Sequence, residues 1–268
     1  MHNGDIVPGN SHFDTTKGHI ESRKAVALDC TVDEAKDTQL EVPFKGNVDP
    51  AKLETALKQY KDKIPFIIVT VTNNTAGGQP VSMQNLREVR ALADKYGKRV
   101  IFDSARFVEN AYFIKTREDG YADKTIKEIV KEMFSLADGM TMSSKKDGLV
   151  NMGGFIATRH EDWYEGAKKF CIPFEGYLTY GGMNGRDMAA LAVGLEENTE
   201  FDNIETRIKQ VQYLAARLDE YGIPYQRPVG GHALFVDADK VLSSVPKEEF
   251  PAQTLAIELY FGGRYPWL

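Results

Sequence analysis

Cysteines are scarce in this sequence, and the two that occur exclude a disulfide framework. Cys30 and Cys171 are the only cysteines among 268 residues. Two residues so far apart fit neither a disulfide-stabilised scaffold nor a cysteine-rich zinc site. With 42% hydrophobic and 27% charged residues, the composition is that of an ordinary globular protein that can bury a sizeable core.

A basic block and a long apolar run are also missing. Lysine and arginine number 33 against 39 acidic residues, which gives a net charge of −6. Binding to nucleic acid or to an anionic membrane surface is therefore not expected. No apolar stretch approaches the roughly 18 residues of a membrane span, and the first residues lack signal-peptide character. These absences favour a cytoplasmic protein.

Apolar runs of strand length alternate with segments of helical period along the chain. Buried strands are predicted at 64–71, 99–102 and 137–142, and a strand-to-loop element at 6–10. Helices are predicted at 82–97, 126–133, 203–222 and 254–260, the first of them capped by Ser82. Strands that alternate with helices favour an α/β protein with a mainly parallel sheet.

No repeat and no linker rich in Pro, Gly or Ser divides the chain, so we expect a single domain over residues 1–268. The sequence begins close to the element at 6–10 and stops shortly after the helical stretch 254–260. A compact domain rarely ends in this way without closing its sheet. We therefore expect a fragment of a longer protein.

Three polar clusters follow predicted strands: Asn73–Asn74, Asp103–Arg106 and Ser143–Lys146. Ligands of open α/β sheets bind outside the carboxyl ends of the strands, so these clusters are expected to lie together. A lysine, a carboxylate and amide or guanidinium groups suit pyridoxal phosphate. The lysine binds the cofactor covalently, the carboxylate pairs with the protonated pyridine nitrogen, and the other groups contact the ring oxygen.

Simpler interpretations of the same residues stay open at this point. Lys145 and Lys146 fit a solvated surface pair equally well, and Asp103 fits a helix cap in front of Ser104. His232, between Gly231 and an apolar run, is interpreted as a hydrogen-bonded buried histidine in preference to a catalytic one. Neither His12 nor His19 has metal-ligand spacing, so no metal is assigned to them.

Longer motifs carry a resemblance to a known family. They are AGGQPVS (76–82), DSARFVENAYFIK (103–115), MSSKKD (142–147), GGHALF (230–235) and FPAQTLA (250–256). These strings resemble the tryptophanases, β-eliminating lyases dependent on pyridoxal phosphate, whose close sisters are the tyrosine phenol-lyases. The similarity runs from about Gly9 to Tyr260. It implies the large domain of the aminotransferase-like α/β fold (fold type I), a mainly parallel sheet with flanking helices, here incomplete.

The resemblance also implies roles for individual residues. Lys146 matches the lysine that bears the cofactor and takes the α-proton of the substrate. Asp103 matches the partner of the pyridine nitrogen, and Asn74 and Arg106 match the contacts of the ring oxygen. Phe13 matches the aromatic residue that stacks on the ring.

Further matches concern the phosphate and a cation. Ser143 matches a phosphate contact, and Asn151 matches a residue near the potassium site of the full-length family. The same resemblance implies a homo-oligomer, a tetramer in the full-length family, that acts on a small aromatic amino acid. The family's N-terminal segment and C-terminal small domain have no counterpart here, and residues 261–268 no longer follow the family.

One position distinguishes the two sister activities. Asp14 follows the stacking Phe13, where phenol-lyases carry a threonine, and a carboxylate there can accept a hydrogen bond from an indole N–H. The resemblance therefore implies β-elimination of L-tryptophan to indole, pyruvate and ammonia, with Asp14 among the catalytic residues. The alternatives are tyrosine phenol-lyase activity and a truncated, inert remnant of the family.

Overall fold

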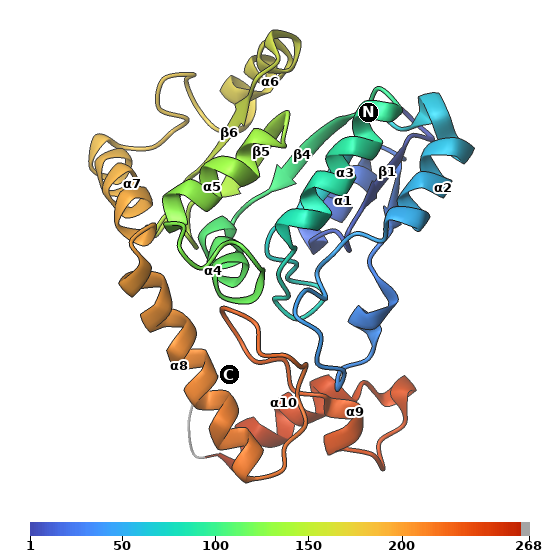
Figure 1. The fold of residues 1–268 in the computed structure, drawn as a ribbon, viewed down its shortest axis with the longest axis vertical. Helices are drawn as coiled ribbons and strands as arrows, with labels where there is room; N and C mark the ends of the chain where they lie inside the picture. The colour runs from blue at the N-terminus through green and yellow to red at the C-terminus, as the bar shows by residue number, and fades with distance from the viewer. Residues whose placement is uncertain (264–268) are drawn as a thin grey trace.

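A mixed sheet of six strands organises the first 158 residues of the protein (Figure 1). The structure is a computed structural model and describes residues 1–263. Of the segment 261–268, where the resemblance ends, residues 264–268 lie outside the described residues. The strands are β1 (Ile6–Gly9), β2 (Val26–Asp29), β3 (Phe66–Thr70), β4 (Arg99–Asp103), β5 (Gly139–Ser143) and β6 (Gly154–Thr158). Their order is β2-β1-β3-β4-β5-β6, and only β6 runs antiparallel to its neighbour.

Helices connect the strands and continue beyond the sheet. The α-helices are α1 (Asp14–Ser22), α2 (Pro50–Tyr60), α3 (Met83–Lys95), α4 (Phe107–Arg117), α5 (Ile126–Ser135), α6 (Glu161–Phe174), α7 (Gly185–Asn198), α8 (Phe201–Glu220), α9 (Ala238–Val241) and α10 (Pro251–Gly262). Short 3-10 helices are η1 (Asp33–Lys36), η2 (Lys61–Lys63) and η3 (Lys247–Glu249). In the described residues, no helix combines the length and the apolar character needed to cross a membrane.

Side chains of the central strands alternate between two apolar layers, as the pleat of a strand requires. Ile67 and Val69 of β3, with Phe102 of β4, point into the larger core, which α2, α3, α4 and α5 complete. Ile68 points to the opposite face, where it packs with Ile20 of α1. The main core is thus on one side of the sheet, and α1 covers part of the other side.

Local signals explain where several helices begin. Ser82 caps α3 by accepting a hydrogen bond from Asn85 N, as the sequence predicts. Thr125 and Glu128 form a reciprocal capping box at the start of α5. Asp49 caps α2, and Pro50 occupies its first helical position.

The predicted strands at 64–71, 99–102 and 137–142 correspond to the parallel strands β3, β4 and β5. The predicted class, α/β with a mainly parallel sheet, is confirmed. The predicted helices at 82–97, 126–133, 203–222 and 254–260 correspond to α3, α5, α8 and α10. Strands β2 and β6 and helices α1, α2, α4, α6, α7 and α9 were not predicted.

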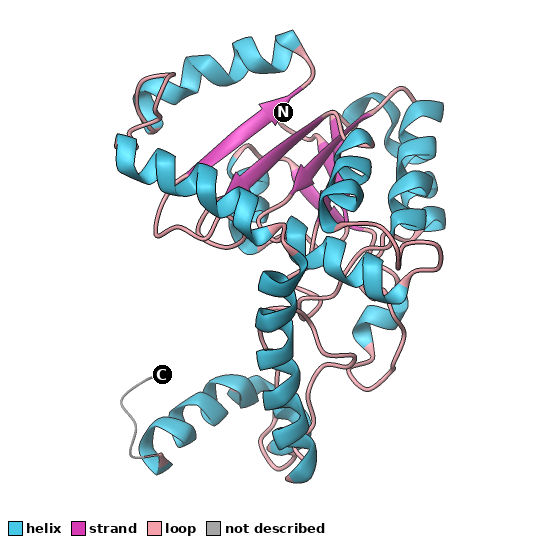
Figure 2. Ribbon diagram, turned by 60° about the vertical axis from the view of Figure 1, so that its left-hand side comes forward, coloured by secondary structure: helices cyan, strands magenta, loops and turns pink. Residues whose placement is uncertain are grey.

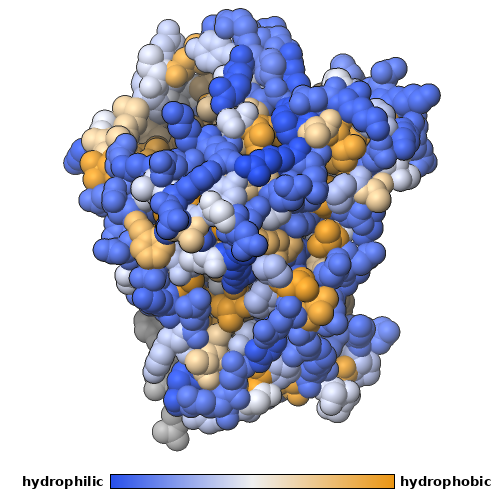
Figure 3. Space-filling model, in the orientation of Figure 1, coloured by the Kyte–Doolittle hydropathy of each residue, from blue (hydrophilic) through white to orange (hydrophobic). Residues whose placement is uncertain are grey.

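The C-terminal helices extend away from the sheet. Helix α8 packs against α4 and α7 and leads to α9 and α10, which lie at the far end of the molecule in both ribbon views (Figures 1 and 2). On the face shown in Figure 3, hydrophilic residues dominate, and apolar residues form small separate patches. Exposed apolar side chains on the helices include Phe170 and Phe174 of α6 and Phe261 of α10.

Candidate active site

The carboxyl ends of neighbouring parallel strands bring the predicted polar clusters to one edge of the sheet. Asp103 is the last residue of β4, where it pairs in register with Thr70 of β3 and Thr141 of β5. Ser143 is the last residue of β5, and Asn74 lies in the turn that follows β3. Phe13 lies in the loop after β1, directly before α1. The shared edge that the sequence predicts is therefore present.

Lys146 lies half-buried in the turn after β5, and its Nζ donates a hydrogen bond to Ser143 Oγ at 2.9 Å. Burial lowers the pKa of Lys146, and the positive charges of Arg106 and Lys145 lower it further, whereas Asp103 opposes the shift. A lysine with a lowered pKa supplies more of the neutral amine that a nucleophile or general base requires. Its neighbour Lys145 is exposed. The two lysines are thus not an equivalent surface pair.

Asp103 is a half-buried strand-end carboxylate. Thr16 of α1 donates a hydrogen bond from Oγ1 to Asp103 Oδ2 at 2.9 Å. Burial raises the pKa of Asp103, while this hydrogen bond and the charges of Lys146 and Arg106 act against the rise. The charge of Asp103 thus interacts with those of Lys146 and Arg106, although the three come from different segments.

The alternative role of Asp103 as a helix cap is wrong. Helix α4 begins at Phe107, with Arg106 as its N-cap residue. The amides of Val108 and Glu109 in its first turn donate to Asp147 Oδ2, at 2.7 and 3.3 Å. The residue after Lys146 therefore caps α4 from a distant part of the sequence, because the turn that carries Lys146 lies against the start of this helix.

Asn74 is joined to a histidine that is distant in the sequence. His232 Nε2 lies 2.8 Å from Asn74 Oδ1, and His232 Nδ1 lies 2.8 Å from Glu109 Oε1. Thr72 Oγ1 donates to the same oxygen of Glu109 at 2.8 Å. His232 is hydrogen-bonded, as interpreted from the sequence, but it is half-buried instead of buried. Its partners were missed, because no sequence pattern connects residues so far apart.

A partly buried ion pair lies beside this chain of contacts. Arg207 of α8 donates from Nη2 to Asp147 Oδ1 at 2.7 Å, and the same nitrogen lies 3.7 Å from Glu109 Oε2. Burial raises the pKa of Asp147, and Arg207 acts against the rise. Asn198 Nδ2 donates to the backbone oxygen of Asp147 at 3.0 Å. Helices α7 and α8 thus hold the turn that carries Lys146.

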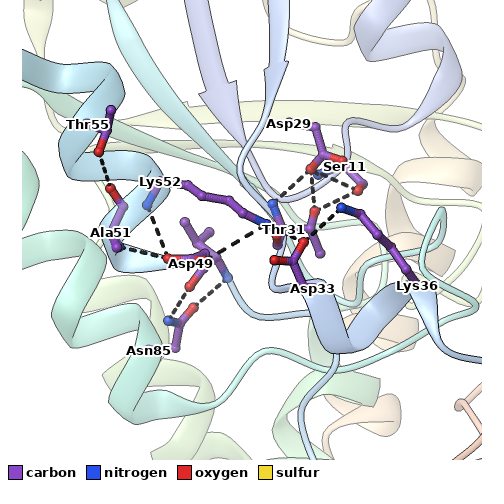
Figure 4. Close-up of polar contacts among 11 residues, drawn as sticks. Ser11, Asp29, Thr31, Asp33, Lys36, Asp49, Ala51, Lys52, Thr55 and Asn85 are labelled. Atoms are coloured by element: carbon purple, nitrogen blue, oxygen red, sulfur yellow. Dashed lines mark hydrogen bonds and ion pairs between the residues drawn. The ribbon is translucent and has the colours of Figure 1, made fainter. Parts of the chain in front are cut away.

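The loop that carries Phe13 and leads into α1 at Asp14 is anchored at the end of β2 (Figure 4). Asp29 Oδ1 accepts four hydrogen bonds, from the backbone and hydroxyl groups of Ser11 at 3.2 and 3.1 Å and of Thr31 at 2.8 and 2.5 Å. Burial of Asp29 would raise its pKa, but these bonds outweigh burial and lower the pKa. They hold Ser11 at a positive φ of 52°.

Asp14 and Asn151 lie apart from the contacts described so far. Asp14 is exposed and begins α1, and Asn151 is exposed in the loop between β5 and β6. Phe13 is half-buried. Within residues 1–263, no group of three or more His, Cys, Asp or Glu side chains is placed to hold a metal ion.

The burial of His12 predicts how the free energy of unfolding depends on pH. Its imidazole is buried, and burial lowers its pKa from 6.5 to about 4, with Lys17 adding to the shift and Asp29 opposing it. The unfolded chain therefore binds more protons than the folded chain between these two values. We expect the free energy of unfolding to fall by about 3 kcal/mol as the pH drops through this window.

Denaturant unfolding of the wild type and of His12→Asn at a series of pH values checks this. The variant should lose that part of the pH dependence, and His19→Asn, at an exposed position of α1, should keep it. Parallel curves for wild type and His12→Asn would show that His12 is not buried in its neutral form.

Comparison with known proteins decides the family. A family model described as beta-eliminating lyase matches residues 3–259. The chain belongs to the beta-eliminating lyase family. A probable beta-eliminating lyase from Trichomonas vaginalis is 79% identical over 257 residues, which are 96% of this chain and 56% of that protein.

Relatives of both sister activities occur at similar distances. A tyrosine phenol-lyase from Pasteurella multocida is 53% identical over 97% of this chain, and a tryptophanase from Salinibacter ruber is 49% identical over 96%. The aligned part is 57% of the first protein and 55% of the second, so the chain spans little more than half the length of these relatives. Identity alone thus does not separate the two activities.

Solved structures show the fold of this lyase-family chain. A complex of SepCysS with the N-terminal domain of SepCysE has a TM-score of 0.58 at 14% identity, over 98% of this chain and 66% of the other. A putative aromatic amino acid beta-eliminating lyase/threonine aldolase from Exiguobacterium also has a TM-score of 0.58, at 17% identity, over 90% of this chain and 61% of the other. This likeness confirms the predicted aminotransferase-like α/β fold, fold type I.

Proposed function

We propose that this chain forms the cofactor-binding part of a pyridoxal-phosphate-dependent carbon–carbon lyase that cleaves L-tryptophan to indole, pyruvate and ammonia. One observation carries the proposal. A half-buried lysine with a lowered pKa and a half-buried aspartate interact electrostatically at the carboxyl edge of a parallel sheet, within a chain of the beta-eliminating lyase family. The activity of the whole protein is part of the proposal.

The residues at this edge fit pyridoxal phosphate by their chemistry. Lys146 offers an amine for the covalent bond, and Asp103 offers a carboxylate for the protonated pyridine nitrogen. Arg106 and Asn74 would contact the ring oxygen, and Phe13 would stack on the ring. Ser143, which already accepts from Lys146 Nζ, would turn to the phosphate.

The same residues account for the chemistry of β-elimination. When bound, pyridoxal phosphate supplies an electron sink for the negative charge that develops at the substrate Cα. Lys146 takes the α-proton, which requires its neutral amine and agrees with the direction of its pKa shift. The carboxylate of Asp103 keeps the proton on the pyridine nitrogen, because a negative charge there favours the protonated ring.

Asp14 would set the preference for tryptophan. A carboxylate accepts a hydrogen bond from an indole N–H, and a site built for such a contact rejects substrates that lack it. The exposed position of Asp14 at the start of α1 leaves it accessible to a substrate. Tyrosine phenol-lyase activity is the second candidate, because relatives of that name match this chain as well as a tryptophanase does.

Two finer proposals accompany the activity. Asn151 would lie near a potassium ion, and the whole protein would be a homotetramer. Both follow from the resemblance to the full-length family. Ion dependence of catalysis and the oligomeric mass of the whole protein test them.

The role of Asp14 predicts a selective loss. We define a hybrid lyase in which residues 9–260 of this chain replace the matching segment of a full-length relative. In this hybrid, Asp14→Thr should reduce turnover of tryptophan by about 10²-fold or more, because the shorter, uncharged threonine side chain replaces the carboxylate that accepts from the indole N–H. Pyruvate release from a β-elimination substrate with a good leaving group should stay nearly unchanged.

Asp14→Asn is the matched control, because its amide oxygen still accepts a hydrogen bond. It should keep more tryptophan turnover than the threonine variant. Equal losses for both substrates in Asp14→Thr would show that Asp14 supports the whole site instead of recognising indole. Turnover of tyrosine by the unmodified hybrid at the rate for tryptophan would favour the second candidate.

A further inference from the structure

Asp147, the residue directly after Lys146, has 0% of its surface exposed and takes no part in the proposed chemistry. Arg207 of α8 donates to its Oδ1 at 2.7 Å, and the amides of Val108 and Glu109 donate to its Oδ2 at 2.7 and 3.3 Å. A charged side chain persists in the interior only when it is paired and hydrogen-bonded. The pairing with Arg207 therefore stabilises the carboxylate of Asp147 at its buried position.

The backbone of Asp147 is held as well. Its amide donates to Ala105 O at 3.2 Å, and its carbonyl oxygen accepts from Asn198 Nδ2 at 3.0 Å. Asn198 is the last residue of α7 and is itself buried. The side chain and the backbone of Asp147 thus bind four segments, namely the loop before α4, α4, α7 and α8. All four lie outside the turn at residues 143–149 that carries Lys146.

Close packing against α7 restrains the same turn. A Cβ atom on Gly194 of α7 would lie 2.1 Å from Gly148 O, and one on Gly148 would lie 2.5 Å from Ser144 O. The backbone of the turn and that of the helix therefore approach more closely than larger residues at these positions would allow. The turn has no space to move toward α7.

Lys146 depends on this anchorage for its place. Among the described residues, its Nζ donates a hydrogen bond only to Ser143 Oγ, which belongs to the same turn. The charges of Asp103 and Arg106 act on the amine from another segment of the chain. The position of the amine relative to these charges is therefore set by where the turn lies.

The helix that carries Arg207 is firmly packed. Ile204 and Ile208 of α8, on either side of Arg207 in the sequence, have 0% of their surfaces exposed and belong to the main core. The guanidinium extends from this base to Asp147, and its Nη2 also lies 3.7 Å from Glu109 Oε2. Arg207 thus connects the core to the residue that follows Lys146.

We propose that Arg207 and Asp147 form a pair of positioning residues, which keeps the amine of Lys146 at the carboxyl edge of the sheet, beside the charge of Asp103. Arg207 acts through Asp147, and Asp147 acts through the backbone that it shares with Lys146. A displacement of about 1 Å at a reacting group can cost about 10²-fold in rate. The placement of the amine belongs to the cofactor-free chain, whereas its consequence for cofactor binding rests on the proposed function.

Acetylation of the cofactor-free chain with acetic anhydride at a series of pH values, followed by mass spectrometry, measures the titration of Lys146. Burial and the charges of Arg106 and Lys145 lower the pKa of Lys146, while Asp103 raises it. When the turn loosens, the amine gains contact with water. The midpoint of its acetylation should then move up toward about 10.4, the value of an ordinary lysine. Midpoints are compared instead of rates, because accessibility alone changes the rate.

Arg207→Met and Asp147→Asn are both expected to raise this midpoint. A direct effect of charge predicts opposite shifts, because loss of a positive charge raises the pKa of an amine and loss of a negative charge lowers it. Arg207→Lys keeps a cation that can pair with the carboxylate, so its midpoint should stay close to that of the wild type. Circular dichroism checks folding. If Arg207→Met does not fold, Asp147→Asn decides, because it leaves no unpaired buried carboxylate.

Two matched controls separate positioning from general stability. Arg217→Met removes an exposed arginine of the same helix, which pairs with Glu220. Ile208→Ala destabilises the same helix by leaving a cavity in the core. Asp147 keeps its partners in both, so the midpoint should not move. A rise in folded Ile208→Ala equal to that in Arg207→Met would overturn the proposal, as would an unchanged midpoint in folded Arg207→Met or Asp147→Asn.

Cofactor binding separates this inference from the proposed function. In Arg207→Met, covalent attachment of pyridoxal phosphate, trapped with borohydride, should slow about tenfold or more, and Arg207→Lys should restore most of the rate. Raised midpoints in variants of a chain that binds no pyridoxal phosphate would contradict the proposed function but not the placement of the amine. Attachment at the wild-type rate in folded Arg207→Met would contradict the positioning role and leave the proposed function standing.

Discussion

In the hybrid lyase, Asp103→Asn is expected to slow exchange of the substrate α-proton with solvent by about 10²–10³-fold. A neutral amide no longer stabilises the protonated pyridine nitrogen, so the electron sink for the charge at Cα weakens. The change is nearly isosteric, and the amide oxygen can still accept from Thr16 Oγ1. Folding should therefore be affected much less than exchange. Deuterium incorporation at Cα, followed by mass spectrometry, measures the rate.

Thr16→Val is the matched control for this experiment. It removes the hydrogen bond to Asp103 but keeps the carboxylate, so it should reduce exchange far less than Asp103→Asn. Exchange at a near-normal rate in folded Asp103→Asn would rule out Asp103 as the partner of the pyridine nitrogen.

Lys146→Ala in the same hybrid should slow α-proton exchange by about 10²–10⁴-fold, the range expected when a general base is removed. Lys145→Ala is its control, because Lys145 is exposed while Lys146 donates to Ser143. The Lys145→Ala substitution should leave exchange nearly unchanged, although the positive charge of Lys145 contributes to the lowered pKa of Lys146. Equal losses in the two variants would show that the base has been assigned to the wrong residue.

The sequence predicted the central part of the sheet because its strands are buried on both faces. Residues 66–69 and 100–102 are continuous apolar runs, and they lie in β3 and β4. The missed strands lie at the edges. Val26 of β2 and Ile156 of β6 are exposed, so neither strand needs the long apolar run that marks a buried one. An edge strand with exposed side chains looks like a loop in the sequence.

The candidate site could be predicted only in part, for a similar reason. Strand ends placed Asp103 and Ser143 at one edge of the sheet, because the carboxyl ends of parallel strands share an edge. The sequence alone could not decide whether Asp103 caps a helix. The structure decides this question, because α4 begins at Phe107 and Asp147 accepts the hydrogen bonds of its first turn.

Contacts between distant segments left no signal in the sequence. Glu109 and His232 are 123 residues apart, and Thr16 and Asp103 are 87 residues apart. Their pairing depends on how the helices pack on the sheet, which no local pattern of residues describes. His232 could be interpreted as a hydrogen-bonded histidine, but its contacts with Asn74 and Glu109 emerge only from the folded structure.

Covalent binding of the cofactor at Lys146 is the central claim, and mapping of a reduced adduct tests it most directly. The wild-type chain is incubated with pyridoxal phosphate, reduced with borohydride, digested and analysed by mass spectrometry. We expect a single pyridoxyl group on the peptide that contains Lys145 and Lys146, absent in Lys146→Ala and present in Lys145→Ala. An adduct that persists in folded Lys146→Ala, or a wild-type chain that gains none, would contradict the claim.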